Sequence, residues 1–369
     1  MIKSSIVFLS LLFLWLGYAI GFVGIANEHP LVVAFLAVWI LMKHPMTRIA
    51  LIFGYFLGAT NGIPEAIRVY NDTTHTIGIL GYIVQAILLT LPFAIFSRFT
   101  WGVAVGAVIL LISPIGWTNP LIISGYLFPD TGTTGILAVV LALLWYRNKF
   151  LLGALAVASL VMNVSYLEPK IGEDVIAINT AYSAPISKTL NFIERGELAI
   201  TSTEGLPNSK VIFPETHFIQ GPSFERVIPY LESITEEENI TIISGLYSLK
   251  DNENVLVVFK KGGTFLLPIQ ANALVPDPNN PLMNIGPSWH LLSPPAQDDK
   301  DLLIVCFEEY HLGLFLWKMT RAHDVNRVIG FENLWWSNGQ QNSMVKVQRM
   351  YARLSARLFG LPYTYVYND

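Results

Sequence analysis

Long apolar runs separated by short polar stretches fill the first 168 residues of the chain. A helix that crosses a lipid bilayer needs about 20 predominantly apolar residues, and several of these runs approach that length. The pattern therefore predicts a transmembrane domain at 1–168, an α-helical bundle that spans the membrane several times. We expect about seven helices, at 5–25, 30–43, 47–63, 77–96, 101–117, 132–146 and 150–167.

From residue 169 onward the pattern changes to short β-branched or aromatic runs between turn-forming and charged residues. Strands and helices alternate, as is typical of a mixed α/β domain, here predicted at 169–369. Lys260-Lys-Gly-Gly263 predicts a hairpin tip with both lysines exposed, and 276–299 predicts a long loop. The predicted strands are 175–179, 210–213, 240–243, 255–259, 302–305 and 328–331, and the predicted helices are 185–202, 224–237 and 340–359.

Charge sharpens the division into two halves. Of the 369 residues only 14% are charged, against roughly 25% in an average soluble domain. Residues 1–168 carry seven Lys or Arg and five acids, whereas the remaining residues carry 16 and 22. The net charge is −4 and there is no basic block, so we expect no nucleic-acid partner.

The bases of the first half lie in alternate loops, which predicts the orientation of the chain. The intervening loops hold Arg68 beside four acids. Because cytoplasmic loops are enriched in Lys and Arg, the N-terminus is predicted to be cytoplasmic, and seven crossings then place 169–369 on the outer face. The bases that define the cytoplasmic side are Lys3, Lys43, Arg48, Arg98, Arg147 and Lys149.

Candidate chemistry follows the ends of two predicted strands. Cys306, the single cysteine, comes directly after 302–305, and a sharp turn after a strand is where α/β enzymes display a nucleophile. Glu215 follows 210–213, where a carboxylate can act as the general base toward a thiol. The alternatives are a buried core cysteine and a solvated loop acid. Glu308 and Glu309 follow the cysteine, and either one can orient backbone or substrate; the alternative is a solvated turn.

Aromatic side chains follow a third strand. Asn333, Trp335 and Trp336 lie after 328–331, where the two indoles form either core packing or the wall of a site for an apolar substrate. The seven histidines show no spacing typical of metal ligands, so we expect no metal and no cofactor.

Together these motifs resemble the carbon–nitrogen hydrolase (nitrilase) superfamily, and within it the apolipoprotein N-acyltransferases. The matching segments are Phe213-Pro-Glu-Thr216, Val305-Cys-Phe-Glu308, Asn333-Leu-Trp-Trp336 and the membrane loop Asn119-Pro…Gly125…Phe128-Pro129. The resemblance implies an αββα sandwich in the periplasm behind membrane helices of the bacterial inner membrane. It also implies Glu215 as base, Cys306 as nucleophile, Glu308 as supporting acid and Asn333, Trp335 and Trp336 as substrate-binding residues.

The chain departs from that family at its catalytic lysine, which precedes a Leu-x-Pro stretch. Here that stretch is Leu274-Val-Pro276, and Gln270 to Ala273 stand where the lysine is expected, so Gln270 is the candidate at that position. The departures make the chain resemble the plasmid-encoded TraB-type conjugal transfer proteins.

Two functions follow from the resemblance. The first is an acyltransferase at the outer face of the inner membrane, with a membrane lipid as acyl donor and an exported or conjugation-apparatus protein as acceptor. The alternative is a non-catalytic membrane component of the conjugation apparatus that retains the fold.

Overall fold

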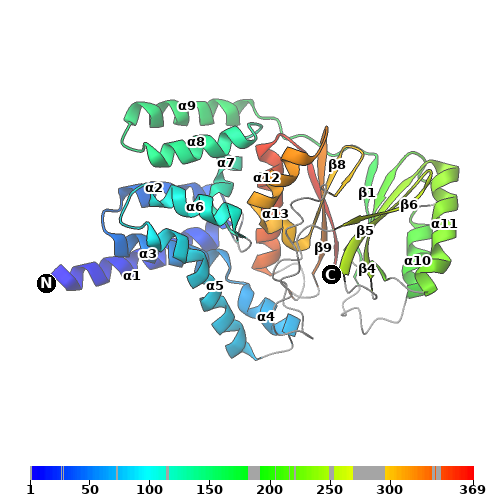
Figure 1. Cartoon of the computed structure of the whole chain (residues 1–369), viewed down its shortest axis with the longest axis horizontal. Coiled ribbons are helices and arrows are strands. Elements are labelled where there is room, and N and C mark those ends of the chain that lie inside the picture. The colour runs from blue at the N-terminus through cyan, green and yellow to red at the C-terminus, as the bar shows by residue number, and fades with distance from the viewer. Residues whose placement is uncertain are drawn as a thin grey trace.

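The computed structural model places a helical half beside a half built on two β-sheets (Figure 1). The secondary structure changes between Ser165, the last residue of helix α9, and Val175, the first of strand β1. The division into two domains at 168/169 remains a prediction. The residues that the structure describes are 2–25, 27, 29–71, 74–113, 116–181, 192–203, 205–215, 217–219, 222–248, 253–268, 296–334, 337 and 342–369.

In the helical half, a helix overlaps each of the seven predicted apolar runs. In the described part of the chain, two helical stretches, Ser5–Ile25 and His75–Ile95, are long and apolar enough to cross a membrane. The number of crossings therefore remains a prediction. The helices are α1 (Ile2–Ile20), continued by η1 (Gly21–Ile25), η2 (Pro30–Val33), α2 (Ala34–Leu41), α3 (Pro45–Ala59), α4 (Ile63–Asn71), α5 (His75–Ile95), α6 (Gly102–Ile112), η3 (Pro120–Ile123), α7 (Ser124–Leu127), α8 (Thr133–Leu144) and α9 (Lys149–Ser165).

Glycines bring α1 and α3 into backbone contact. A Cβ atom on Gly21 would lie 2.1 Å from the carbonyl oxygen of Tyr55, and one on Gly58 would lie 2.1 Å from that of Tyr18. Gly17 and Gly54 are equally close to the facing backbone. Small residues four positions apart permit this close approach of the two backbones.

Arg48 was predicted to lie in a cytoplasmic loop. The structure places it in the first turn of α3, where its side chain is buried. Its guanidinium donates to the Met42 carbonyl at 2.6 Å and to the Ser97 carbonyl at 3.0 Å. A hydrogen bond also links Tyr146 to Thr100. The α2–α3, α5–α6 and α8–α9 connections therefore meet at one end of the helical half.

The other half contains two sheets. Sheet A has the order β1-β2-β4-β5-β6 with β3 beside β4, and sheet B has the order β10-β9-β8-β7. Strands β1, β2 and β4 are parallel, as are β8, β9 and β10. The strands are β1 (Val175–Ala177), β2 (Lys210–Ile212), β3 (Phe218–Ile219), β4 (Thr241–Ser248), β5 (Glu253–Lys260), β6 (Gly263–Pro268), β7 (Gln297–Asp298), β8 (Asp301–Val305), β9 (Arg327–Asn333) and β10 (Tyr363–Asn368).

Three apolar clusters show that the layers are stacked as helix, sheet, sheet, helix. Ile243 of sheet A packs with Ile329 of sheet B between the sheets. Helices α10 (Phe192–Thr201) and α11 (Pro222–Glu238) cover the outer face of sheet A through Ala199 and Leu231. Helices α12 (Leu312–Arg321) and α13 (Ser343–Leu358) cover sheet B.

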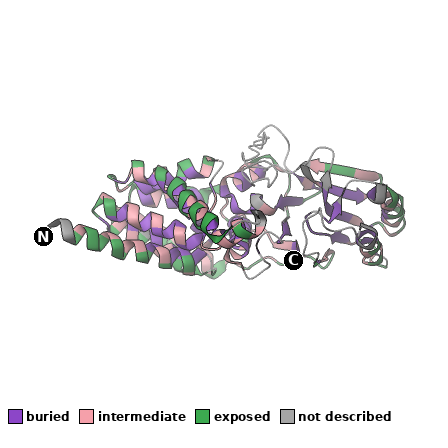
Figure 2. Cartoon of the chain, turned by 90° about the horizontal axis from the view of Figure 1, so that it is seen from below, coloured by how far each residue is buried: buried purple, intermediate pink, exposed green. Residues whose placement is uncertain are grey.

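Helices α12 and α13 also pack against the helical half (Figure 1). Met350 and Tyr351 belong to the same buried cluster as Tyr55 and Phe93, and Figure 2 shows buried residues continuing from one half to the other. The Tyr351 hydroxyl donates to the Asn119 carbonyl at 2.8 Å, and Arg357 donates to the Gly125 carbonyl at 3.0 Å. The loop Asn119–Phe128 singled out in the sequence is therefore a contact surface for α13.

The hairpin at Lys260 differs in part from the prediction. Gly262 and Gly263 form the turn with φ of 98° and 123°, and Lys261 is exposed. Lys260, however, is partly buried and donates to Asp298 at 2.8 Å. Asp298 lies in β7, so a short strand occupies the end of the segment 276–299 that was predicted to be a loop.

Candidate functional site

Three of the predicted site residues lie at the same edge of the sandwich. Glu215 follows β2, Cys306 follows β8 and Asn333 ends β9. Because β2 is parallel to β4 in sheet A and β8 is parallel to β9 in sheet B, these residues all lie at carboxyl ends of parallel strands. Ligands commonly bind at this edge in α/β proteins.

Cys306 adopts a left-handed backbone conformation, with φ of 43°. It begins the 3-10 turn η5 (Cys306–Tyr310), so the strand ends abruptly at this residue. A residue with a Cβ atom in this conformation costs about 1–2 kcal/mol, and such strain is concentrated at functional sites. The geometry is that of a nucleophile at a sharp strand-to-helix turn.

Cys306 and Glu215 are in contact. The Cys306 thiol donates a hydrogen bond to the Glu215 carboxylate. Burial raises the pKa of Cys306 well above its ordinary value, and the negative charge of Glu215 raises it further. The Glu215 carboxylate is thus placed to accept the thiol proton, while the buried and negatively charged surroundings of Cys306 hold the thiol in its neutral form.

The turn that carries Glu215 is fixed by helix α10. Arg195 donates to the His217 carbonyl at 3.2 Å, and the His217 ring contacts the Arg195 carbonyl, also at 3.2 Å. His217 stacks on Phe213. Burial, followed by the charge of Arg195, lowers the pKa of His217 to about 3, so its imidazole is neutral and serves as a packing and hydrogen-bonding group.

Glu308 forms a buried ion pair with Lys318 of α12. The two charged groups are 2.7 Å apart, and both side chains are buried. The same Glu308 oxygen accepts the Val305 backbone N–H at 2.9 Å, and Lys318 donates to the Leu303 carbonyl at 3.1 Å. The pair therefore binds the end of β8 immediately before Cys306.

A second buried charge network lies on the helix-covered face of sheet B. Arg349 of α13 donates to Glu332 through two nitrogens, at 2.9 and 2.7 Å, and Tyr363 donates to Glu309 at 2.9 Å. Burial and the charge of Glu332 raise the pKa of Glu309 well above its ordinary value. Burial also raises the pKa of Glu332, to about 7, and the hydrogen bonds from Arg349 oppose that shift. Glu332 therefore ionises first, and Glu309 keeps its proton to the higher pH.

The remaining predicted site residues are only partly described. The Asn333 side chain accepts from Asn368 at 3.3 Å, which joins β9 to β10. Gln270, Trp335 and Trp336 lie outside the described residues.

Sequence reasoning missed Arg195, Lys318, Glu332 and Arg349. The available signal was a lone charge within an apolar run, such as Lys318 in Leu314-Phe-Leu-Trp-Lys318 and Glu332 after Val328-Ile-Gly-Phe331.

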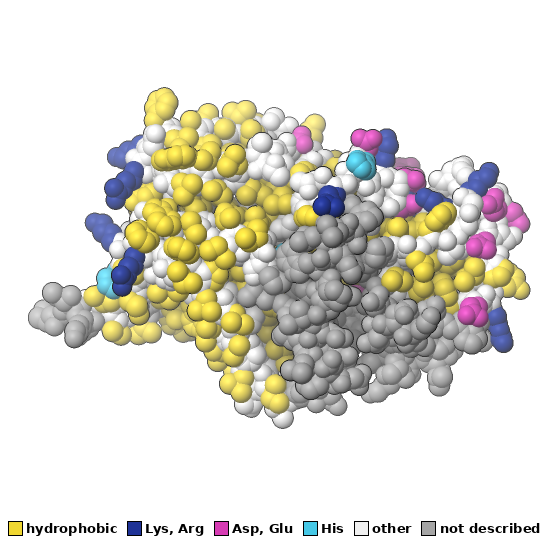
Figure 3. Space-filling view, viewed as in Figure 1, with side chains coloured by type: hydrophobic (Ala, Val, Ile, Leu, Met, Phe, Trp, Pro, Cys, Tyr) yellow, Lys and Arg dark blue, Asp and Glu magenta, His cyan; other side chains and the backbone are white. Residues whose placement is uncertain are grey.

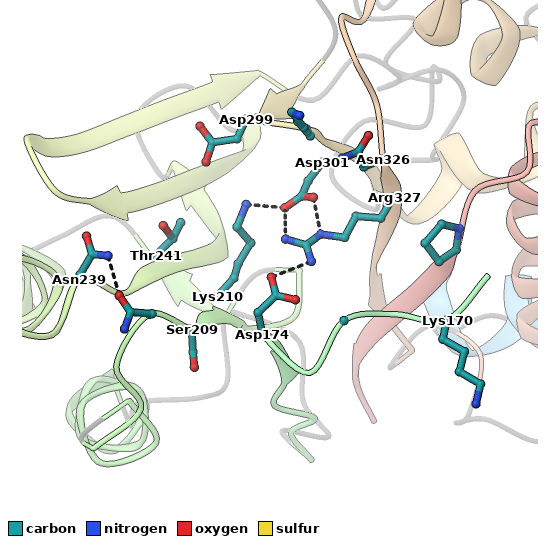
Figure 4. Close-up of a pocket in the computed structure, with 14 residues that line it drawn as sticks. Lys170, Asp174, Ser209, Lys210, Asn239, Thr241, Asp299, Asp301, Asn326 and Arg327 are labelled. Atoms are coloured by element: carbon teal, nitrogen blue, oxygen red, sulfur yellow. Dashed lines mark hydrogen bonds and ion pairs between the residues drawn. The ribbon is translucent and has the colours of Figure 1, made fainter.

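A polar cavity of about 540 Å³ opens at the opposite edge, where the parallel strands begin (Figure 4). Lys210 of sheet A donates to Asp298 at 2.7 Å and to Asp301, both of sheet B. Arg327 donates to Asp301 and, at 2.9 Å, to Asp174. These ion pairs join the two sheets at the edge away from Cys306, and we interpret the cavity as part of that structural contact.

Comparison with known proteins gives distant relatives over nearly the whole chain. No family model matches. A "Probable conjugal transfer protein TraB" of Sinorhizobium fredii (strain NBRC 101917 / NGR234) is 22% identical over 380 residues, 95% of this chain and 95% of the relative. A "Conjugal transfer protein TraB" of Agrobacterium fabrum (strain C58 / ATCC 33970) is 22% identical over 400 residues, 97% of this chain and 92% of the relative. The chain is therefore distantly similar, along almost its full length, to proteins named for conjugal transfer.

Proposed function

We propose that this chain is a membrane-embedded acyltransferase of a conjugal transfer apparatus, with Cys306 as nucleophile and Glu215 as general base. The observation that carries the proposal is the strained turn at Cys306, whose thiol is hydrogen-bonded to Glu215. The four-layer stacking and the motifs around both residues support membership of the nitrilase superfamily. The names of the relatives support the conjugal role.

The proposed reaction has two steps. Glu215 takes the thiol proton while the Cys306 sulfur attacks the ester carbonyl of a phospholipid. The carbon–oxygen bond then breaks, the lysophospholipid leaves as an alcohol with the proton from Glu215, and the acyl group remains as a thioester. An amine of an exported or apparatus protein next attacks the thioester. An amide forms, and the thiol is regenerated with the proton that Glu215 accepts from the amine.

The position of the bases supports a membrane topology with the N-terminus in the cytoplasm. Apolar side chains dominate the surface of the helical half, whereas Lys and Arg gather at its far end and acids lie over the sheet half (Figure 3). Lys43, Arg98 and Arg147 are exposed in the three connections that meet at one end, and the exposed Lys149 begins α9 next to the last of them. This arrangement follows the positive-inside rule.

Alkaline phosphatase fusions test that topology. Fusion after residue 170 is expected to be active in the periplasm, and fusion after Lys149 is expected to be inactive. The reverse pattern would contradict both the orientation and the compartment.

Mass spectrometry of the Cys306 peptide tests the chemistry. Membranes that contain the full chain are expected to yield an acyl adduct on Cys306 that hydroxylamine removes, as it does other thioesters. Glu215→Gln is expected to lower the adduct at least about a hundredfold, the lower end of the range for loss of a general base, and Cys306→Ala is expected to abolish it. An adduct that forms to the same extent in Glu215→Gln would contradict the assignment of Glu215 as the general base.

A second candidate is a non-catalytic component of the same apparatus. The observation in its favour is electrostatic: the carboxylates Glu215 and Glu332 act on Cys306 and oppose thiolate formation. Absence of any adduct, together with conjugation at the wild-type frequency in Cys306→Ala and loss of conjugation when the gene is deleted, would establish this alternative.

A further inference from the structure

We propose that Lys318 is a positioning residue for Cys306, acting through Glu308. This inference rests on the proposed function, because it describes how the same thiol is held ready to react. Lys318 lies on α12 and does not belong to the motifs that carry the family resemblance.

The contacts form a short chain from Lys318 to the turn. Lys318 binds Glu308 at 2.7 Å, and Glu308 binds the Val305 N–H at 2.9 Å, one residue before Cys306. Lys318 also binds the Leu303 carbonyl at 3.1 Å. The buried Lys318 ammonium thus fixes the final residues of β8 and the Glu308 carboxylate, which caps the start of η5.

The Lys318–Glu308 ion pair also affects the electrostatic environment of Cys306. Glu308 is two residues from a thiol on which the carboxylates Glu215 and Glu332 already act. With Lys318 in place the pair is neutral, so Glu308 fixes the backbone without adding a further negative charge to the site. Loss of Lys318 leaves that negative charge uncompensated, and thiolate formation then becomes harder.

Alkylation of the single cysteine measures this effect directly. Iodoacetamide labelling of the full chain in membranes is followed by intact mass between pH 6 and 10. In Lys318→Met the labelling rate at pH 8 is expected to be about tenfold lower, because one pKa unit changes the thiolate fraction tenfold. In Glu308→Gln the pH profile is expected to move to lower pH.

The double variant Lys318→Met/Glu308→Gln restores a neutral pair and is expected to return the profile to that of the wild type. It also serves if the single Lys318→Met chain does not fold. Lys300→Met, an exposed lysine at the opposite edge, is the matched control and is expected to leave the profile unchanged.

Identical pH profiles in all the proteins would overturn the proposal. The proposal would also be overturned if the labelling rate fell equally in the single and the double variant while the pH profile stayed unchanged. That result would show that Lys318 has a purely structural role. A wild-type thiol that does not label up to pH 10 would overturn both this proposal and the proposed function. If the pH profiles of labelling shift as expected but no acyl adduct forms on Cys306, the positioning role of Lys318 stands and only the proposed acyl transfer is contradicted.

Discussion

The proton held by Glu309 predicts a specific pH dependence of folding stability. The carboxyl group is buried beside Glu332 and accepts a hydrogen bond from Tyr363. Burial first, and then the charge of Glu332, raise the pKa of Glu309 in the folded chain well above the ordinary value of 4.5. The folded state therefore binds this proton more tightly than the unfolded state does.

The sign of the effect follows from linkage. The contribution to stability is fully present below the unfolded pKa and is lost as the pH rises toward the folded pKa. Each pH unit between the unfolded and the folded pKa removes about 1.4 kcal/mol from the free energy of unfolding. In Glu309→Gln the amide replaces the protonated carboxyl and this part of the slope disappears.

Urea unfolding in detergent, followed by circular dichroism at pH 5, 6, 7 and 8, provides the measurement. Above pH 5, the difference in unfolding free energy between wild type and Glu309→Gln is expected to change by about 1.4 kcal/mol per pH unit until the folded pKa of Glu309 is reached. Glu332→Gln is the contrasting variant. It leaves Arg349 buried without its carboxylate and is expected to destabilise the chain by about 3–5 kcal/mol at pH 8, where Glu332 is ionised in the wild type. Parallel curves for wild type and Glu309→Gln across this range would refute the assignment of the proton to Glu309.

Three further outcomes are expected. Gly58→Leu forces a side chain against the Tyr18 carbonyl and should lower stability by about 3 kcal/mol or more in thermal unfolding, whereas Gly153→Ala, which meets nothing within 4 Å, should not. Lys210→Met removes a partner of the buried Asp298 and Asp301 and should cost about 3 kcal/mol, while exposed Lys261→Met should be neutral. Lys210→Met should also leave the rate of Cys306 alkylation unchanged in the folded chain, because the ion pairs lie at the opposite edge; a large change would show that the two edges are coupled.

The sequence predicted elements whose apolar pattern is local. The strands β2, β8 and β9 and the helices α11 and α13 agree with the predicted positions to within a few residues, because their β-branched runs or helical spacing stand out from their neighbours. It did not predict α12, where Gly313 interrupts the pattern and faces the Leu111 carbonyl, or the C-terminal strand β10, whose alternating tyrosines follow Pro362.

The candidate site shows the same limit. Strand ends indicated Glu215 and Cys306, and their contact depends on how the two sheets face each other. Lys318 and Arg349 approach the site from helices on the outer face of sheet B, so no short motif links them to Cys306. Lys318 contacts Glu308, 10 positions away in the sequence, and Arg349 contacts Glu332, 17 positions away. Sequence spacing alone does not predict either contact.

The packing of α13 against both halves has a consequence for the order in which the chain assembles. Ribosomes make the helical half first, and the surface around Asn119 stays uncovered until α13 is made, because Tyr351 binds it across a separation of 232 residues. Contacts of such long range close slowly and leave apolar surface exposed to aggregation and proteolysis in the meantime. Substitutions in α13 should therefore act in the cell mainly through the amount of protein that survives synthesis, which pulse-chase labelling separates from any loss of activity per molecule.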